Sequence, residues 1–407
     1  MLRPDTFALT ALLALITALG PVSTDMYLPS LPDIGRLLAT DPAHVQLTLS
    51  AYLAGFAAGQ IIYGPFSDRY GRKPILLLSL VLFGAANLAC AAAPDIGVLI
   101  AARTLQAMGG SGAIVVARAI VRDLYAGARA GRELSLMGSI MALAPIMAPL
   151  LGGVLQTTFG WRANFLVALC VGLVAAAIVW RRLPETLRRR APEPVSIGGV
   201  VRVYRGLIGN RAFLAHVAIG ASSYAGLFAW LSGSAFVLQD LYALTALGYS
   251  IAFAICSCGY LAGTFVASAI VGRLGIGATI GIGTFALAAG GLAMGVALTV
   301  AATSIAAIVL PTSLYLFGLG LTLPQAMAGA LTPFPDRAGA ASSLVGFVQQ
   351  TSAAILGVGV GHMLGASAWP IAAPMAAMGC TALLAWAMSR HVRAARRPLS
   401  GARTTGR

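Results

Sequence analysis

The sequence predicts an all-α membrane protein whose twelve transmembrane helices form two six-helix halves. Of its 407 residues, 58% are hydrophobic and 10% are charged, whereas a soluble domain carries roughly 25% charged residues. Apolar runs recur along the chain with about the 20 residues that a helix needs to cross a bilayer. These observations exclude a soluble enzyme, a disordered chain and a nucleic-acid-binding protein, despite the net charge of +15.

Each predicted span is a continuous run of Leu, Ala, Ile, Val and Gly between charged or turn-rich breaks. Such runs differ from the ten-residue alternation that is typical of a β-barrel strand. The first six spans are predicted at residues 7–29, 45–66, 74–93, 98–120, 133–156 and 163–181. The last six are predicted at residues 212–236, 247–270, 277–298, 302–327, 339–364 and 370–389.

Arginine and lysine gather in the N-terminal stub, in alternate loops and in the basic tail at residues 391–407. With the N-terminus inside the cell, only Arg36 and Arg162 clearly face outward. The positive-inside rule therefore predicts that both termini are cytoplasmic. The basic residues that indicate this orientation include Arg69, Arg72, Lys73, Arg122, Arg129, Arg132, Arg188, Arg189, Arg190, Arg393, Arg396 and Arg397.

A segment rich in proline and arginine at residues 182–211 is predicted to link an N-terminal half, 1–181, to a C-terminal half, 212–390. The two halves share a short pattern. SDRYG at residues 67–71 is followed 204 residues later by VGRLG at residues 271–275, in each case after the second span of a half. Two similar halves predict a binding cavity at their interface near the middle of the membrane, with access that alternates between its two sides.

The sequence predicts neither an enzyme nor a cofactor or metal site. A Ser–His–Asp set, a spacing of metal ligands and a glycine-rich phosphate loop are missing from the sequence. The five cysteines lie inside predicted spans, where we interpret them as small apolar packing residues rather than a disulfide framework.

The loop after the second span, GPFSDRYGRKP at Gly64–Pro74, is predicted to act as a gate. Its glycines permit tight turns and close helix approach, and its carboxylate lies among cations that can form charge-assisted hydrogen bonds. Asp123, at the inner end of the fourth span, is expected to pair with Arg72 or its neighbours. The alternative is a set of surface ion pairs of little energetic value. The predicted gating residues are Gly64, Asp68, Arg69, Gly71, Arg72, Lys73, Arg118 and Asp123.

The fifth span contains Pro145 and Pro149, followed by Gly152 and Gly153. Missing amide donors and small side chains predict a bend and close packing against a neighbouring helix. A packing kink without a functional role is the alternative.

Asp25 lies within the outer half of the first span, where a lone carboxylate is costly when ionised. We interpret it as a proton-coupling group. Arg103, in the fourth span, has a similar depth and is its expected partner, because a buried arginine without one is costly. The alternatives are an Asp25 that meets water at the outer interface and an Arg103 that is only a structural anchor.

Aromatic and amide side chains on helices that could line the cavity are the candidates for binding a substrate, because aromatic faces suit varied apolar ligands. Tyr224 and Phe228 are four residues apart and share a helix face, which makes them the strongest pair. Each candidate has the alternative of facing lipid or packing inside the bundle. The candidates are Tyr52, Phe56, Gln106, Tyr224, Phe228, Trp230 and Gln349. Gln350, next to Gln349 in the eleventh span, is a further amide candidate.

Several of these segments resemble the major facilitator superfamily. The Gly64–Pro74 loop resembles the superfamily signature between its second and third helices. RTLQAMGGSGA at Arg103–Ala113 resembles its fourth-helix R-x-x-Q-x-x-G-G pattern. APIMAPLLGG at Ala144–Gly153 is similar to the motif of the proton-antiport branch, with Ala148 where glycine is usual.

Further segments narrow the resemblance to the bicyclomycin-resistance (Bcr/CflA) subfamily of twelve-helix drug:proton antiporters. They are FGWRANF from Phe159, LPET from Leu183, TDMYLPSLP from Thr24, ARAIVRDLY from Ala117 and LTPFPDRAGAASSLVGF from Leu331. The resemblance implies the major facilitator fold, with the first and fourth helices of each half lining the cavity and Asp25 as the first-helix acid.

The same resemblance implies a monomer in the bacterial inner membrane that exchanges protons for small amphipathic or antibiotic compounds by alternating access. Its expected partners are a drug, protons and the lipid bilayer, with no nucleic acid and no cofactor. The alternative is a proton-coupled exporter of an amino-acid-like or sugar-like metabolite with the same fold.

Overall fold

The computed structural model describes residues 7–125, 127–187, 197–301, 303–334 and 337–394, and the regular structure within these ranges is helical. The first part of the chain forms α1 (Phe7–Asp25), η1 (Leu28–Ser30), α2 (Leu31–Leu37), α3 (Pro42–Tyr70), α4 (Arg72–Ala92), α5 (Ile96–Leu124), α6 (Gly127–Phe159) and α7 (Arg162–Arg182). The second part forms α8 (Ile197–Ile208), α9 (Arg211–Phe236), η2 (Val237–Leu241), α10 (Ala246–Val300), α11 (Ala306–Leu331), α12 (Ala338–Met363) and α13 (Trp369–Ala394).

The described helices supply the twelve predicted membrane crossings. Ten continuous helical segments are long and apolar enough to cross a bilayer, with α1, η1 and α2 counted together and α9 joined to η2. One of them, α10, is broken at Gly275 and crosses twice. The helix α6 adds the remaining crossing, and its apolar part is Leu143–Phe159.

The short repeat predicted between the two halves has a matching backbone geometry. Gly71 lies between α3 and α4 with φ of 107°, and Gly275 interrupts α10 with φ of 78°. Residues with a Cβ rarely adopt such angles, and glycine adopts them without strain. Both glycines therefore allow the chain to turn back into the membrane after the second crossing of each half.

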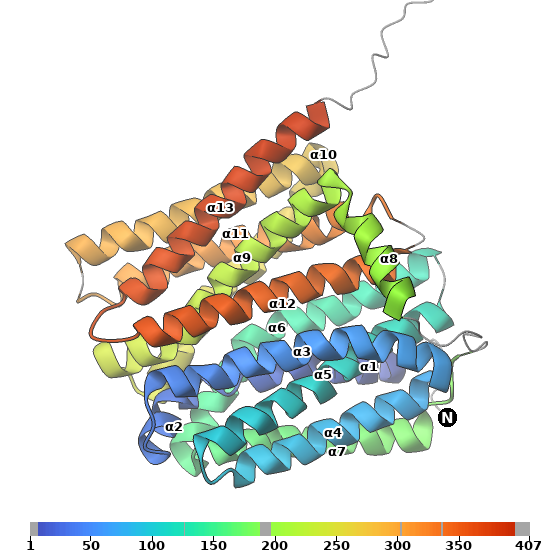
Figure 1. Cartoon of the computed structure of the whole chain (residues 1–407). Helices are drawn as coiled ribbons and strands as arrows, with labels where there is room; N and C mark the ends of the chain where they lie inside the picture. The colour runs from blue at the N-terminus through green and yellow to red at the C-terminus, as the bar shows by residue number, and fades with distance from the viewer. Residues whose placement is uncertain (1–6, 126, 188–196, 302, 335–336, 395–407) are drawn as a thin grey trace, which may run out of the picture.

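The helices lie side by side in two groups, with α1–α7 in the lower part of Figure 1 and α9–α13 in the upper part. The groups meet mainly where α3 packs on α12 and where α6 packs on α10. The helix α8 crosses one end of the bundle, near the turn between α3 and α4 (Figure 1). We call this the linker end, and we call the opposite end, which carries α2 and η2, the far end.

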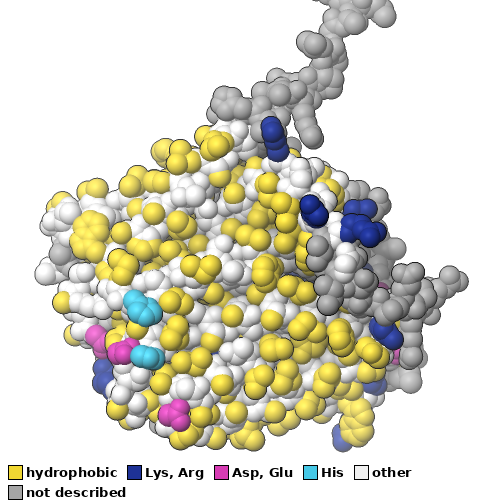
Figure 2. All heavy atoms as spheres, viewed as in Figure 1, with side chains coloured by type: hydrophobic (Ala, Val, Ile, Leu, Met, Phe, Trp, Pro, Cys, Tyr) yellow, Lys and Arg dark blue, Asp and Glu magenta, His cyan; other side chains and the backbone are white. Residues whose placement is uncertain are grey.

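The surface has the polarity of a membrane protein. On the face in Figure 2, apolar side chains cover the middle, whereas lysine and arginine gather toward the linker end and acids and histidines toward the far end. Large side chains such as Phe265, Phe285 and Leu310 are exposed. An apolar belt of this kind suits contact with lipid, because the hydrocarbon core offers no hydrogen-bonding partners.

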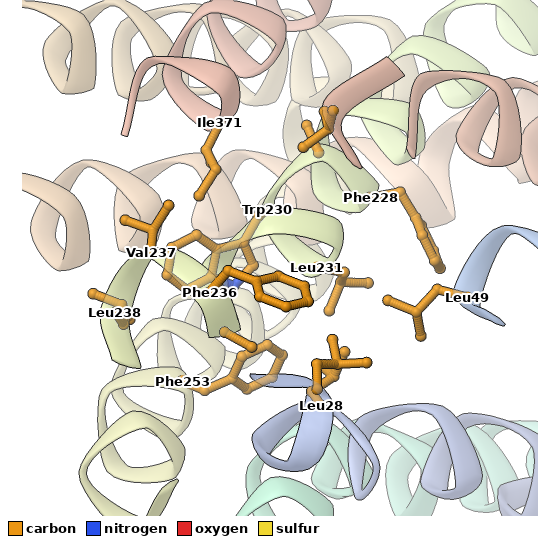
Figure 3. Packing of buried hydrophobic residues seen from close by; sticks show 14 of the residues in the cluster. Leu28, Leu49, Phe228, Trp230, Leu231, Phe236, Val237, Leu238, Phe253 and Ile371 are labelled. Atoms are coloured by element: carbon orange, nitrogen blue, oxygen red, sulfur yellow. The ribbon is translucent and has the colours of Figure 1, made fainter. Parts of the chain in front are cut away.

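At the far end the two halves share one apolar core. Leu28 of η1 and Leu49 of α3 belong to the same buried cluster as Leu231, Phe236 and Phe253 of the second half, and Figure 3 shows these side chains together. Toward the linker end the buried clusters belong either to the first half or to the second. Apolar packing therefore seals the far end.

Polar contacts between the two halves are also found at the far end. At the far end, Arg36 pairs with Asp240 at 3.1 Å, Gln239 donates to the carbonyl oxygen of Pro29 at 3.0 Å, and Gln46 donates to Ser232 at 3.0 Å. Within the described residues, no side-chain hydrogen bond or ion pair joins the halves at the linker end.

The linker contains one element that the sequence analysis did not predict. The helix α8 begins at Ile197, and its Leu207 is fully buried in an apolar cluster with Phe213 and Val217 of α9. This segment was predicted to be part of the linker because proline and arginine residues flank its apolar residues. Arg188, Arg189 and Arg190 and most of the predicted tail lie outside the described residues.

Candidate functional site

A cavity of about 310 Å³ lies between the two halves, deeper than the sealed far end. Aromatic and aliphatic side chains from both halves dominate its wall, and the polar groups are few. The wall is formed by Gly20, Pro21, Thr24, Asp25, Tyr52, Leu53, Phe56, Met141, Pro145, Tyr224, Leu227, Phe228, Leu231, Phe253, Ser257, Tyr260, Leu316, Leu319, Leu323 and Gln350.

Among the described residues that form this wall, Asp25 is the only one with a carboxylate side chain. It is the last residue of α1, and its exposed fraction is 8%. Among the described residues, no lysine or arginine forms an ion pair with it. The charged form of Asp25 therefore lacks a compensating cation among the described residues.

Arg103 is held beside this acid, although the two do not form the expected ion pair. Its Nη1 atom donates to the Ser23 carbonyl oxygen at 3.2 Å and to Gln106 Oε1 at 2.5 Å. Because the last carbonyl groups of a helix lack partners within that helix, the guanidinium caps the end of α1. Arg103 therefore acts as a structural anchor, which was the alternative to an ion pair with Asp25.

Aromatic rings enclose the guanidinium of Arg103, whose exposed fraction is 0%. Its Cζ atom lies 4.3 Å from the ring centre of Tyr52, 4.5 Å from that of Tyr27 and 5.9 Å from that of Phe165. Cation–π contacts of this kind gain strength where water is excluded. The cage fixes the positive charge behind the cavity wall.

Four of the seven predicted substrate-binding side chains lie in the cavity wall: Tyr52, Phe56, Tyr224 and Phe228. The ring centres of Tyr224 and Phe228 are 5.0 Å apart, as expected for residues that share a helix face.

The other three predicted side chains lie elsewhere. Trp230 is fully buried and stacks on Phe253. Gln106 donates to Asn87 Oδ1 at 2.7 Å and accepts from Arg103. Gln349 packs against Gly220 of α9. Trp230 and Gln349 lie on helices that line the cavity, α9 and α12, but on faces that turn away from it, whereas Gln106 lies on α5, which contributes no side chain to the wall.

Gln350, the further amide candidate, lies in the wall, and so does Tyr260, which was not predicted. Gln350 directly follows Gln349, so a helix can turn only one of the two toward the cavity. Tyr260 lies in the eighth predicted span, and its four-residue spacing from Cys256 and Thr264 gave no signal for a binding face.

The proline pair in α6 creates a link between the halves. Pro149 lacks the amide hydrogen that would bond to the carbonyl oxygen of Pro145, four residues earlier. The hydroxyl of Ser257, in α10, donates to that oxygen at 3.1 Å. The helix continues through both prolines to Phe159, and the freed carbonyl group becomes a contact between α6 and α10.

The glycines that follow allow the close packing that the sequence predicts. A Cβ atom on Gly152 would collide with the main chain of Met26, and one on Gly153 would collide with the hydroxyl of Ser250. Met26 belongs to the first half and Ser250 to the second, so this turn of α6 fits tightly against both halves near the far end.

The predicted pairing of Arg72 with Asp123 is confirmed at the linker end. Arg72 Nε donates to Asp123 Oδ2 at 2.8 Å, and Arg72 Nη1 lies 2.5 Å from Asp68 Oδ1. Glu185, which the analysis missed as a partner, accepts from the main-chain amides of Arg72 and Lys73 at 3.0 and 3.2 Å. The LPET segment that contains Glu185 was the available signal.

The remaining predicted gating residues are placed less tightly. Arg69 lies over the ring of Tyr70 at 5.5 Å. A Cβ on Gly64 would meet no atom within 4 Å, so this glycine makes no close helix contact. Arg118 is exposed and takes no part in the ion pairs of Arg72. Gly71 is held by its backbone angle and by Glu185.

Two similar helical halves, sealed at one end around a cavity with a single acid, define a secondary transporter of the membrane. Residues 13–358 match the Major Facilitator Superfamily. The chain belongs to this family, whose members are transporters rather than enzymes.

Similar proteins agree with this assignment. The chain is 36% identical over 349 residues to the uncharacterized MFS-type transporter YdgK of Bacillus subtilis, covering 84% of this chain and 86% of that protein. It is 31% identical over 358 residues to multidrug resistance protein D of Escherichia coli, covering 88% and 89%. It is 29% identical over 393 residues to a bicyclomycin resistance protein homolog of Haemophilus influenzae, covering 94% and 96%.

Solved structures show the same fold. The crystal structure of a D-xylose-proton symporter superposes with a TM-score of 0.73 at 16% identity, covering 94% of this chain and 96% of the other. A bacterial homolog of the human lysosomal transporter Spinster gives a TM-score of 0.73 at 16% identity, covering 97% and 98%. The predicted all-α fold of the major facilitator type is confirmed.

Proposed function

We propose that the protein exports small amphipathic compounds, including antibiotics, across the bacterial inner membrane in exchange for protons. The names of two relatives, multidrug resistance protein D and bicyclomycin resistance protein homolog, support export of drugs. The apolar and aromatic wall supports amphipathic substrates, because few polar groups are available to recognise a sugar or an amino acid.

The observation that carries the proposal is the position of Asp25 in the cavity wall without a cation partner. An ionised carboxylate in this setting is unfavourable, so protonation and substrate binding compete for the same space. Drug leaves the protein on the outside when Asp25 takes up a proton. Asp25 then releases its proton to the cytoplasm, and another drug molecule enters the cavity from that side.

The proposed orientation places the linker end in the cytoplasm, because the basic side chains gather there. The far end then faces outward, and its apolar seal closes the outer entrance. In this arrangement the structure is inward-facing. The ion pairs around Arg72 act within the first half as a latch, which tightens against the second half when the linker end closes.

The test is transport by everted membrane vesicles with an imposed pH gradient. The wild-type protein accumulates chloramphenicol when the lumen is acidic, whereas Asp25→Asn, inserted at a normal level, does not. Uptake that ignores the gradient would contradict proton coupling. A growth-inhibition panel with the overexpressed protein distinguishes drug export from metabolite export, because only the former raises drug tolerance.

A further inference from the structure

Two arginines near the linker end of α5 have no role in the latch. Arg118 and Arg122 are both exposed, and among the described residues neither forms an ion pair or a side-chain hydrogen bond. Arg72, in contrast, is engaged by both Asp68 and Asp123. An unpaired arginine inside a membrane span is costly unless it meets water.

The helix face that carries these arginines leads from the cavity toward the second half. Ile114, one turn before Arg118, packs with Tyr52 and Phe56 of the cavity wall. Arg122 follows one turn after Arg118 on the same face. A Cβ atom on Gly339 of α12 would stand 3.8 Å from Arg122 Nη1. The two guanidinium groups therefore stand in series between the cavity and the linker end.

Among the described residues, the acids at this end do not neutralise the two arginines. Asp68 and Asp123 are paired with Arg72, and Glu185 accepts from main-chain amides. Glu133 accepts a hydrogen bond from Thr10 at 2.7 Å. The described carboxylates are thus committed to other partners, and the described side chains along the route to the cavity carry a net positive charge.

We propose that Arg118 and Arg122 form a charge filter on this route, which admits neutral amphipathic compounds and rejects lipophilic cations. A surface lined by one sign of charge lowers the local concentration of ions of that sign. This inference rests on the proposed function, whose substrate class it narrows.

The filter is measurable without any transported drug, by the rate at which charged thiol reagents reach the cavity. In purified protein with the five native cysteines replaced by alanine, Leu323→Cys places a reporter in the cavity wall. The probes are anionic and cationic methanethiosulfonates of similar size (the sulfonatoethyl and trimethylammonioethyl reagents). Ile208→Cys, on the exposed surface of α8, supplies the reference rates.

At each reporter cysteine, we divide the modification rate of the anionic reagent by that of the cationic one. We expect this ratio to be about tenfold higher at the cavity reporter than at the surface reporter. The preference disappears in Arg118→Gln/Arg122→Gln, reverses in Arg118→Glu/Arg122→Glu and persists in Arg118→Lys. High salt reduces it. Arg181→Gln, which removes an exposed arginine of α7, is the matched control and keeps the preference.

A preference that is unchanged in the glutamine double variant, or missing from the protein with both arginines, would overturn the filter. Arg118→Lys is the control for misfolding, because it changes the side chain and keeps the positive charge. A second arm compares the uptake of ethidium and chloramphenicol by everted vesicles, where the glutamine double variant gains ethidium uptake several-fold. A normal reagent preference without transport of any drug would count against the proposed function alone.

Discussion

Arg103 caps the carbonyl oxygen of Ser23 at 3.2 Å, two residues before Asp25. This contact ties α5 to the end of α1, at the point where the acid enters the cavity. A second bond to Gln106, and through it to Asn87, extends the tie to α4. The position of the acid therefore depends on an arginine that does not pair with it.

The first prediction concerns the shape of this anchor. Arg103→Lys keeps the charge but cannot hold Ser23 and Gln106 while stacking on Tyr52. We expect at least a tenfold loss of drug efflux and a destabilisation of about 2 kcal/mol, the scale of a hydrogen bond to a charged group. Vesicle transport and thermal unfolding in detergent measure the two effects. Arg181→Lys is the control, and an unchanged Arg103→Lys protein would show that the cap is dispensable.

The second prediction concerns the seal next to α6. Gly152→Ala introduces a Cβ that collides with the main chain of Met26, which cannot move as a flexible side chain would. We expect a destabilisation of about 1–3 kcal/mol, as for other overpacked sites, and reduced transport. Gly359→Ala is the matched control, because nothing lies within 4 Å of its Cβ. Equal melting temperatures for the two variants would refute the close fit at Gly152.

The third prediction concerns the latch at the linker end. Arg72 and Asp123 have side-chain exposures of 9% and 21%, so their pairing is only partly screened by water. A double-mutant cycle with Arg72→Ala and Asp123→Ala should give a coupling energy of about 1–3 kcal/mol, between the values for exposed and buried pairs. Unfolding measurements on the four proteins supply it. Strict additivity would mean that the ion pair contributes nothing.

The fourth prediction compares the two kinds of contact at the far end. Arg36 and Asp240 are 62% and 47% exposed, so Asp240→Asn should destabilise the closed far end by no more than about 1 kcal/mol. Phe236→Ala removes a ring from the shared apolar core and should cost about 3–5 kcal/mol. Labelling of a cysteine placed at Leu28 reports the opening of this end. A larger destabilisation from Asp240→Asn than from Phe236→Ala would show that the ion pair, and not the apolar core, closes the far end.

Much of the fold was accessible to sequence reasoning, because a bilayer requires long apolar helices and orients them by flanking charge. The short repeat that contains Gly71 and Gly275 predicted two similar halves, and both glycines adopt positive φ at equivalent turns. The helix α8 was missed, because a short segment with isolated arginines has neither the length nor the composition of a span.

The site was accessible only in part, since a motif indicates a helix but not the direction of each side chain. Tyr224 and Phe228 were assigned to the cavity by their spacing, whereas Trp230, two residues later, points into the apolar core. Arg103 was expected to seek the nearest acid. The rings of its aromatic cage and the carbonyl group of Ser23 come from α1, α3, α7 and the turn at Tyr27, so no local sequence pattern indicated them.

The central claim is that Asp25 exchanges its proton for drug. The most direct measurement is the release of protons into a weakly buffered solution when chloramphenicol is added to the purified protein in detergent. We predict that the wild-type protein acidifies the solution, and that Asp25→Asn binds chloramphenicol without doing so. Equal proton release from the two proteins, at equal drug occupancy, would contradict the claim.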